Sequence, residues 1–307
     1  MAPPPKKTQY SDSRAARLAL LDQLANRVVE LRSSETWSRF LATQARFHRY
    51  SPRNVMLISM QRPEATNVAG YRAWAELDRH VLKGEQGLSI LAPMVARDPT
   101  SDQHRITGFR WVSVFDISQT EGEPLPTPVT LLDDADPGHL EDRLCAVAHS
   151  LNLRVLEADL PDGVNGELRW SDNTIAIRGS NAPLQRAKTI AHELGHALLH
   201  RSERDRSRAE IEAESVAFVV LGALGADTAP YSAGYVASWL GEDGDLAAAI
   251  TRSCEAIQRA SAQIISRVSA TQDLLDHRIP FATAQFAHRA PSTPSGRGPR
   301  TDIPPRH

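Results

Sequence analysis

The sequence is poor in cysteine, and this shortage excludes two kinds of scaffold. Of its 307 residues, only Cys145 and Cys254 are cysteines, and they lie far apart along the chain. A disulfide framework or a Cys-rich zinc site needs several cysteines at short spacings. The two residues are therefore predicted to be reduced thiols buried on helices.

Long hydrophobic runs are also missing. No apolar run approaches the roughly 18 to 20 residues that a membrane-spanning helix needs. The first residues, Met1 to Lys7, contain proline and lysine and no apolar core of a signal peptide. We therefore expect no membrane partner and a cytoplasmic location, and the length allows two domains of ordinary size.

Net charge is close to zero overall, but the two halves of the chain have opposite signs. Residues 1–116 contain 17 Lys and Arg against 11 Asp and Glu, a net charge of +6. Residues 117–282 contain 14 against 25, a net charge of −11, and the tail from residue 283 has a net charge of +3. A basic first half and an acidic second half predict that the two meet different partners.

The most informative stretch of the chain runs from His192 to His196 and reads His-Glu-Leu-Gly-His. Two histidines four residues apart lie one above the other on a helix, so both rings can aim a nitrogen at a single metal ion. Glu193, next to the first histidine, is placed to take a proton from a water that the ion activates. The pattern predicts a zinc hydrolase site, since two histidines and a carboxylate favour Zn²⁺.

The flanking residues support a helix around this motif. Ser180-Asn181-Ala182-Pro183 supplies a polar cap and an early proline, and apolar residues then recur at helical spacing up to Leu198. A second helical run, residues 209–220, contains Glu210 and Glu214 one turn apart, among small and apolar residues. A carboxylate in such a run is costly to bury unless it binds a cation or a histidine, so the pair suits a third ligand and its hydrogen-bonding partner. Glu212, between them, is predicted to face solvent.

His200 continues the four-residue spacing of the histidines but is not predicted to bind the same ion. It lies about 12 Å along the helix axis from His192, which is too far for a shared tetrahedral site. The sequence also lacks the glycine and third histidine of a metzincin. We interpret His200 as a residue at the helix C-terminus, where the helix dipole favours it.

Residues on either side of the two helices could complete a peptidase site. Residues 167–170 and 174–177, joined by a Ser-Asp-Asn turn, predict a hairpin. Its edge would accept an extended peptide by strand addition, or the hairpin would only pack in the core. Tyr231 and Tyr235 are candidate donors to a transition-state oxyanion, although aromatic residues near Trp239 are more often packing residues.

Arginine and aromatic residues are interleaved in the first half. Helices are predicted over residues 11–31, 36–47 and 52–60. A short helix from Gly70 to near His80 and strands over 88–92 and 109–115 are also predicted. Such a small α+β platform suits single-stranded nucleic acid, whose bases stack on rings and whose phosphates attract guanidinium groups. The aromatic residues Trp37, Phe40, Phe47 and Trp74 would equally suit a core. The residues best placed for DNA contact are predicted to be Arg49, Tyr50, Arg53, Tyr71, Arg72, Trp74 and Lys83.

Several short motifs in series resemble the ArdC-type antirestriction proteins of plasmids. These are Pro52-Arg53-Asn54, Tyr71-Arg72-x-Trp74, Lys83-Gly84-Glu85-x-Gly87, Ile90-Leu91-Ala92-Pro93 and Val114-Phe115-Asp116-Ile117-Ser118-Gln119-Thr120. The second half resembles peptidases related to the ImmA and IrrE regulators, through His-Glu-Leu-Gly-His and the Glu-x-x-Ala-Glu helix. The resemblance covers residues from about 10 to 280.

The resemblance implies an α+β protein with two domains. A small helical and β single-stranded DNA binding domain, residues 10–120, would precede a mainly helical, zincin-like (gluzincin) metallopeptidase domain, residues 138–282. A linker over residues 121–137 and a disordered tail over 283–307 are expected. In HExxH peptidases of this kind, the ligand glutamate precedes the acid that bonds a ligand histidine by four residues. This implies Glu210 as third zinc ligand and Glu214 as the partner, with the reverse assignment left open.

The function implied is an antirestriction-type protein that binds incoming single-stranded DNA and carries a zinc peptidase site. In that site, Glu193 is the general base and an unknown protein is the substrate. Two alternatives remain open. The chain could be a regulatory zinc protease that cleaves a repressor, or a single-stranded DNA binding protein whose metal site is not catalytic.

Overall fold

In the first half of the chain, helices pack around the base of a long β ribbon. The computed structural model describes residues 7–97, 104–125, 138–202, 205–226 and 246–276. Helices α1 (Lys7–Glu30), α2 (Ser34–Arg46) and α3 (Pro52–Gln61) are followed by β1 (Val68–Gly70), α4 (Tyr71–Glu76) and β2 (Arg79–Val81). Then come β3 (Leu88–Arg97), β4 (His104–Asp116), a 3₁₀ turn η1 (Ile117–Gln119) and β5 (Thr120–Gly122). Each expected helix and strand has a counterpart, and both central strands are longer than predicted. The short helix expected to end near His80 ends at Glu76, and strand β2 follows in its place.

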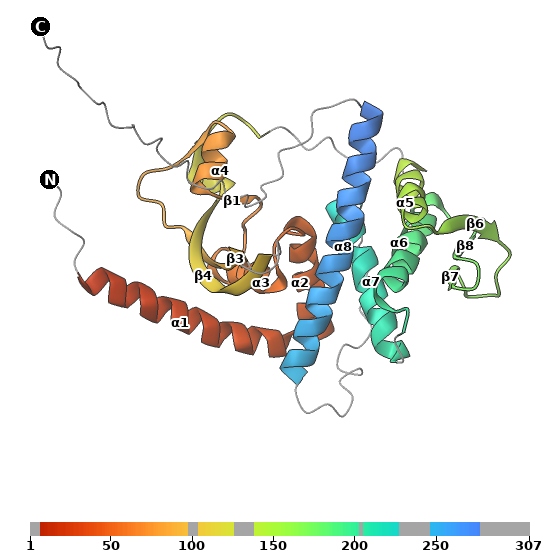
Figure 1. Cartoon of the computed structure of the whole chain (residues 1–307), viewed down its shortest axis with the longest axis horizontal. Coiled ribbons are helices and arrows are strands. Elements are labelled where there is room, and N and C mark those ends of the chain that lie inside the picture. The colour runs from red at the N-terminus through yellow and green to blue at the C-terminus, as the bar shows by residue number, and fades with distance from the viewer. Residues whose placement is uncertain (1–6, 98–103, 126–137, 203–204, 227–245, 277–307) are drawn as a thin grey trace, which may run out of the picture.

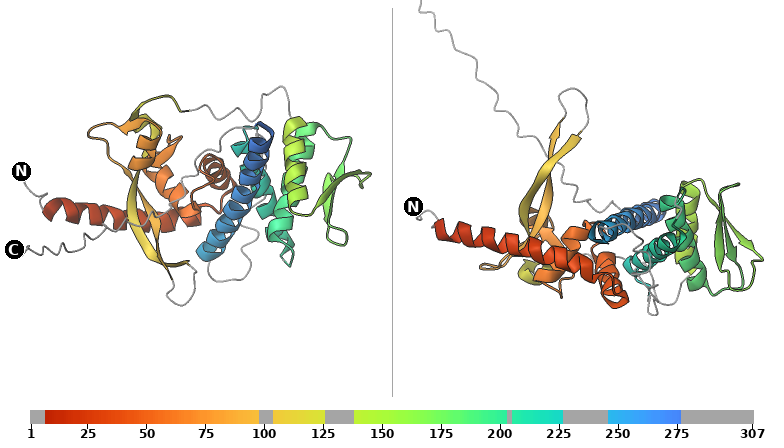
Figure 2. Two further views of the ribbon diagram at one scale, coloured as in Figure 1. Left: turned by 45° about the horizontal axis from the view of Figure 1, so that its top comes forward. Right: turned by 90° about the horizontal axis from the view of Figure 1, so that it is seen from below.

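Antiparallel pairing organises this half. The order β1-β4-β3 forms one sheet, β2 and β5 form a second pair, and β3 and β4 run together as a ribbon that projects from the helices (Figure 2). Asp116 joins β4 to the neighbouring loop, because its carboxylate accepts the backbone N–H groups of Thr66 and Ser118. Those bonds outweigh the effect of burial and lower the pKa of Asp116.

In the described residues, the second half is a three-stranded sheet beside four helices. Helix α5 (Gly138–Ser150) leads to β6 (Arg154–Ala158), and the predicted hairpin is observed as β7 (Gly166–Arg169) and β8 (Thr174–Arg178). The strand order is β6-β8-β7, so β7 is an edge strand. Helices α6 (Pro183–Leu199), α7 (Arg206–Ala223) and α8 (Leu246–Asp276) follow. The α+β fold class is thereby confirmed.

Helix α6, which carries the histidine motif, begins differently from expectation. Pro183 occupies the first turn as predicted, but the N-cap residue is Ala182, which makes no side-chain capping bond. The fixed backbone of proline is therefore the only local start signal that this end of α6 uses. The two cysteines are free thiols as predicted, Cys145 half-buried on α5 and Cys254 buried on α8.

The two halves of the chain share one hydrophobic core. Helix α2 packs on α7, and α1 and α3 contact α8, which crosses between the halves (Figure 1). Trp37 of α2 is fully buried, and its Nε1 donates to Oγ of Ser215 on α7 at 3.1 Å. Gln258 of α8 donates in turn to the carbonyl of His48. Among the residues that the structure describes, no helix combines the length and apolar character required to cross a bilayer.

Candidate metal centre and nucleic-acid surface

Helices α6 and α7 bring three metal-binding side chains together. The Nε2 atoms of His192 and His196 lie 3.0 Å apart. Glu210 of α7 places Oε2 3.4 Å from the first of these nitrogens and 3.6 Å from the second. The three ligand atoms thus converge on one point, although they come from positions up to 18 residues apart in sequence.

The dimensions of this triangle fit a tetrahedral zinc ion. Bonds of about 2.0–2.1 Å to nitrogen and oxygen separate the ligand atoms of such an ion by about 3.3 Å. The observed separations of 3.0, 3.4 and 3.6 Å lie on both sides of that value. Two imidazole nitrogens and one carboxylate leave a fourth position for water or substrate, which is the arrangement of catalytic and not structural zinc sites.

The carboxyl group of Glu193 lies beside the triangle in a buried position. Its residue is 6 % exposed, and the backbone N–H of Leu168 on β7 bonds its carboxylate. Burial raises the pKa of Glu193, and the neighbouring histidines oppose this only in part. A carboxylate with a raised pKa is a better proton acceptor near neutral pH than an exposed one.

Glu214 lies one helical turn beyond Glu210 and contacts the other side of His192. Its Oε2 is 3.3 Å from Nδ1 of that ring, and its Oε1 pairs with Nζ of Lys188 at 2.6 Å. Burial opposes ionisation of Glu214, but the bonds with His192 and Lys188 outweigh it and lower the pKa. Glu210 thus lies near the two Nε2 atoms and Glu214 near Nδ1 of His192, and the assignment of Glu210 as ligand and Glu214 as its partner stays a prediction.

A polar cleft of about 350 Å³ opens onto these residues. Its walls come from α6, α7 and the segment leading into the edge strand β7. At Gly166, an added Cβ would lie 2.3 Å from Cγ2 of Thr189, so this strand approaches α6 more closely than any side chain would allow. An unpaired strand edge next to the metal-binding triangle is the geometry that strand addition of a peptide requires. Tyr231 and Tyr235, the candidate oxyanion donors, lie outside the described residues.

One sequence-based prediction near the site is wrong. Glu212 was expected to face solvent but is 6 % exposed, because α8 packs over that side of α7. Its carboxylate accepts from Oγ of Ser253 at 2.5 Å and lies 3.0 Å from Nε2 of His200. His200 ends α6, as predicted, but the interaction that its ring makes through Nδ1 with Nδ1 of His196, at 3.0 Å, was not anticipated. The four-residue spacing of the histidines was the available signal.

The residues predicted to contact DNA come from several elements and are not all accessible. Arg49, Arg53, Tyr71, Arg72 and Lys83 are exposed and lie on the α2–α3 turn, α3, α4 and the turn after β2. Of the other two, Tyr50 is half-buried and Trp74 is buried. Trp74 is 2 % exposed and donates to the carbonyl of Phe115, and Tyr50 donates its hydroxyl to the carbonyl of Val68. Direct contact of Trp74 with DNA is therefore incompatible with this conformation, because the ring fills the core beneath α4.

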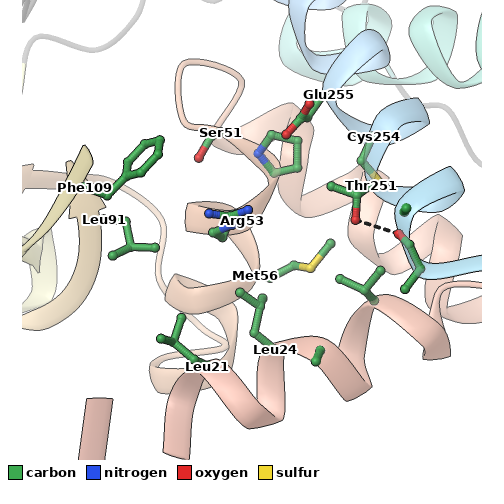
Figure 3. A pocket seen from close by; sticks show the side chains of 15 residues that line it. Leu21, Leu24, Ser51, Arg53, Met56, Leu91, Phe109, Thr251, Cys254 and Glu255 are labelled. Carbon is green, nitrogen blue, oxygen red and sulfur yellow. Dashed lines mark hydrogen bonds between the residues drawn. The ribbon is translucent and has the colours of Figure 1, made fainter. Parts of the chain in front are cut away.

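An aromatic residue that sequence reasoning missed lies in a larger groove. This groove, about 640 Å³ in volume, is bounded by α1, α3, the β3–β4 ribbon and α8. Figure 3 shows Phe109 on one wall, Glu255 of α8 on the opposite wall and Arg53 between them. Phe109 is 54 % exposed. The sequence analysis placed Phe109 in a strand but gave it no role, and the ribbon that carries the residue projects from the helices (Figure 2).

Comparison with protein families agrees with the two halves of the fold. Residues 19–121 match the family model of the N-terminal domain of anti-restriction factor ArdC. Residues 148–231 match the IrrE N-terminal-like domain of the M78 peptidase family, and they contain His192, Glu193, His196, Glu210 and Glu214.

Individual relatives are more distant. An uncharacterized protein of Bacillus anthracis is 25 % identical over 245 residues, which is 64 % of this chain and 41 % of that protein, so the chain spans about two fifths of the relative's length. The crystal structure of metal-free antirestriction protein ArdC from plasmid R388 is 18 % identical with a TM-score of 0.41, over 75 % of this chain and 87 % of that one. Its Mn(II)-bound form is 20 % identical with a TM-score of 0.42, over 76 % and 96 %.

The family assignment rests on the two matched segments and on their order along the chain. An ArdC N-terminal domain is followed by an IrrE-like domain, and the sequence motifs that suggested each lie within the matched residues. Residues 19–121 are thus identified as similar to the N-terminal domain of anti-restriction factor ArdC, and residues 148–231 as similar to the IrrE N-terminal-like domain of a peptidase family.

Proposed function

We propose that this protein binds single-stranded DNA through its first half and hydrolyses a peptide bond at a zinc site in its second half. Residues 10–120 and 138–282 are assigned to these two tasks, joined through residues 121–137. The observation that carries the enzymatic part is the convergence of three ligand atoms beside a buried glutamate, in a cleft bordered by a strand edge.

In this proposal His192, His196 and Glu210 hold the metal. A zinc ion bound there would lower the pKa of a water molecule to about 7 and polarise a substrate carbonyl. Glu193 takes the proton of the attacking water and later delivers it to the departing amine. Its buried carboxyl suits both steps, since burial raises the pKa of Glu193 and makes its carboxylate a better proton acceptor. The edge of β7 aligns the extended peptide.

The test of the peptidase uses the full-length protein loaded with Zn²⁺. The substrate probe is a peptide library prepared from a digested bacterial proteome, and cleavage is read by mass spectrometry. Glu193→Gln should abolish cleavage and leave zinc content unchanged, because Glu193 moves a proton and does not bind the ion. Glu35→Gln, at an exposed position on α2 outside the cleft, is the matched control and should cleave normally. Cleavage that survives in Glu193→Gln would contradict the role of general base.

The DNA-binding part of the proposal uses the groove between α1, α3 and the ribbon. Phe109 offers a ring on which a base can stack, and Arg53 lies in the same groove as a cation for the phosphate chain. Arg105 and Arg110 extend the exposed positive charge along β4. Glu255 on the far wall repels phosphate, so the backbone of the strand should follow the ribbon side of the groove.

Binding of a fluorescent single-stranded oligonucleotide across a salt series tests this part. Affinity should fall with salt at a slope near −0.7 for each phosphate contacted. Phe109→Ala should weaken binding by about 1–3 kcal/mol, the usual contribution of a stacked base, at an unchanged salt slope. Arg53→Ala should reduce the slope by about 0.7. Ile106→Ala, at an exposed position on the ribbon, serves as the control. Phe115→Ala would be unsuitable because Phe115 packs against Tyr71. Equal binding of single strand and duplex would contradict the proposal.

A further inference from the structure

A row of polar groups connects the metal-binding triangle to α8. Nδ1 of His196 lies 3.0 Å from Nδ1 of His200, and Nε2 of His200 lies 3.0 Å from Oε2 of Glu212. The other carboxylate oxygen, Oε1, accepts from Oγ of Ser253 at 2.5 Å. These groups come from the end of α6, the middle of α7 and the interior of α8. Apart from His196, the members of this row lie in the core and are not part of the triangle.

The hydrogen-bonding capacity of each group determines where the protons lie. A carboxylate can only accept, so Nε2 of His200 must be the donor to Glu212. A neutral imidazole with its proton on Nε2 accepts at Nδ1. His196 must therefore donate from its own Nδ1, and its Nε2 carries a free lone pair. That lone pair is the one directed toward His192 and Glu210.

We propose that His200 and Glu212 are positioning residues that hold His196 with its Nε2 lone pair facing the metal. This inference rests on the zinc site of the proposed function. Metal-ligating histidines in general donate their second N–H to a fixed acceptor, which sets the tautomer and the ring orientation. His192 donates to a carboxylate, Glu214, directly. For His196, the imidazole of His200 lies between its ring and the carboxylate of Glu212. His200 therefore serves as the acceptor, and Glu212 fixes the tautomer of His200.

Burial makes this row rigid enough to orient a ring. The side chains of His200 and Glu212 are 5 % and 8 % exposed, so water cannot easily replace either bond. Ser253 is 2 % exposed and anchors the carboxylate from the opposite side. Arg208, one turn before Glu212 on α7, places Nε 3.7 Å from Oε1 and adds a positive charge near the carboxylate. Helix α8 therefore contributes to metal binding without supplying a ligand.

The experiment separates hydrogen bonding from packing at His200 in the full-length protein. Zn²⁺ affinity of the metal-free protein is measured by competition with a chromophoric chelator. His200→Phe keeps a ring in the site but has no acceptor, and it should weaken zinc binding by about 10- to 100-fold. His200→Asn is smaller but places Oδ1 where Nδ1 of His200 stood, so it should recover at least about tenfold of that loss. His149→Phe, at an exposed position on α5, is the matched control and should bind zinc normally.

Each outcome has a defined meaning. If His200→Phe binds zinc as the native protein does, or binds it more tightly than His200→Asn, then His200 acts by packing and the proposal is overturned. If the native protein itself does not bind zinc, the proposed function fails at its metal site. Thermal unfolding of each metal-free variant, followed by circular dichroism in excess chelator, shows whether the fold is intact.

A second measurement covers the case in which His200→Phe does not fold. Long-range ¹⁵N–¹H spectra of histidine-labelled, metal-free native protein report which ring nitrogen carries the proton. His196 should be protonated on Nδ1 in the native protein. In Glu212→Gln, the side-chain amide can donate to His200, so a population of His196 protonated on Nε2 should appear. A native spectrum in which His196 is protonated on Nε2 would overturn the proposal.

Discussion

Burial and hydrogen bonding act in opposite directions on individual residues of the metal site. Burial lowers the pKa of His192, but the bonds that its ring makes with Glu210 and Glu214 outweigh this effect and raise it to about 9. Hydrogen bonds from His192 and, in second place, from His196 lower the pKa of Glu210, although burial would raise it. The metal-free site therefore holds a proton on His192 between two carboxylates.

Zinc binding should release that proton. A histidine must lose its proton on the ligating nitrogen before it binds a metal, and a pKa of about 9 keeps His192 protonated at pH 7. Apparent zinc affinity should fall about tenfold for each pH unit below 9 and level off above it, where the proton is already absent. Calorimetric titrations at pH 7 in buffers of different ionisation enthalpy measure the number of protons released. Heats that do not depend on the buffer would contradict the prediction.

The two glutamates of α7 should respond differently to substitution. Glu210→Ala removes a ligand, so stoichiometric zinc binding should be lost. Glu214→Gln keeps the size of the side chain but weakens its bond to Nδ1 of His192, and it should reduce zinc affinity by about 10- to 100-fold while the stoichiometry stays at one. Equilibrium dialysis against a zinc buffer distinguishes the two results. The opposite pattern would make Glu214 the third ligand.

At the scale of secondary structure elements, the approach of α7 to α6 brings Glu210 within reach of the histidines. Gly195, in the middle of the histidine motif, faces α7 without a side chain between the helices. A Cβ added there would lie 3.0 Å from the Cα of Ala213 and 3.3 Å from its carbonyl oxygen. Small residues at this crossing therefore set the distance between ligands that come from two different helices.

Gly195→Ala should weaken both stability and metal binding. Alanine favours a helix over glycine by about 1 kcal/mol, but overpacking a tight contact costs about 1–3 kcal/mol, and the backbone of Ala213 cannot move independently of α7. We expect a net loss in the free energy of unfolding and at least tenfold weaker zinc binding, because Glu210 shifts away with its helix. Urea denaturation and chelator competition measure the two effects.

Gly222→Ala is the matched control for that substitution. It adds the same methyl group to a helical glycine of α7, where the nearest atom is Cβ of Ala45 at 3.3 Å. Its stability can change in either direction, but its zinc affinity should equal that of the native protein. Equal losses of zinc affinity in both variants would show that the spacing of α6 and α7 is not what matters.

At the scale of the whole molecule, the first and second halves of the chain are not independent bodies. Helices α1 and α2 cover α8 and α7, and Trp37 is buried between the halves with its Nε1 donating to Ser215. Ser215 directly follows Glu214 on α7. A fragment ending before residue 126 would expose this core surface, so experiments on DNA binding require the full chain.

Trp37→Ala should destabilise both halves together. Removing a fully buried tryptophan costs about 3–5 kcal/mol, and the shared core predicts one cooperative unfolding transition. Denaturation followed by circular dichroism should shift as a whole, with hydrogen exchange increased in α7 as well as in α2. Trp170→Ala, at a residue 39 % exposed, is the control and should change the free energy of unfolding by less than about 1 kcal/mol. Two separate transitions, with only the first shifted, would contradict a shared core.

Local patterns were sufficient for the parts of the site that lie on single helices. The spacing of His192 and His196 follows from 3.6 residues per turn, and the four-residue spacing of Glu210 and Glu214 is a property of one helix surface. Helices α1 to α4 and strands β3 and β4 of the first half were predicted for the same reason, whereas the short strands β1, β2 and β5 were not predicted. The shared core was not predicted, because the composition of the linker does not indicate which faces of α2 and α7 meet.

What the sequence by itself determined is the set of side chains: two imidazoles and a glutamate on one helix, two carboxylates on another, and an α+β chain with a basic first half. Only the tertiary structure decided that Glu212 is buried, that His200 is joined to His196, that Trp74 fills a core and that Phe109 is exposed. The physical reason is that a helix surface has several faces of similar composition. Which face is covered depends on contacts between residues far apart in sequence, here above all on the position of α8.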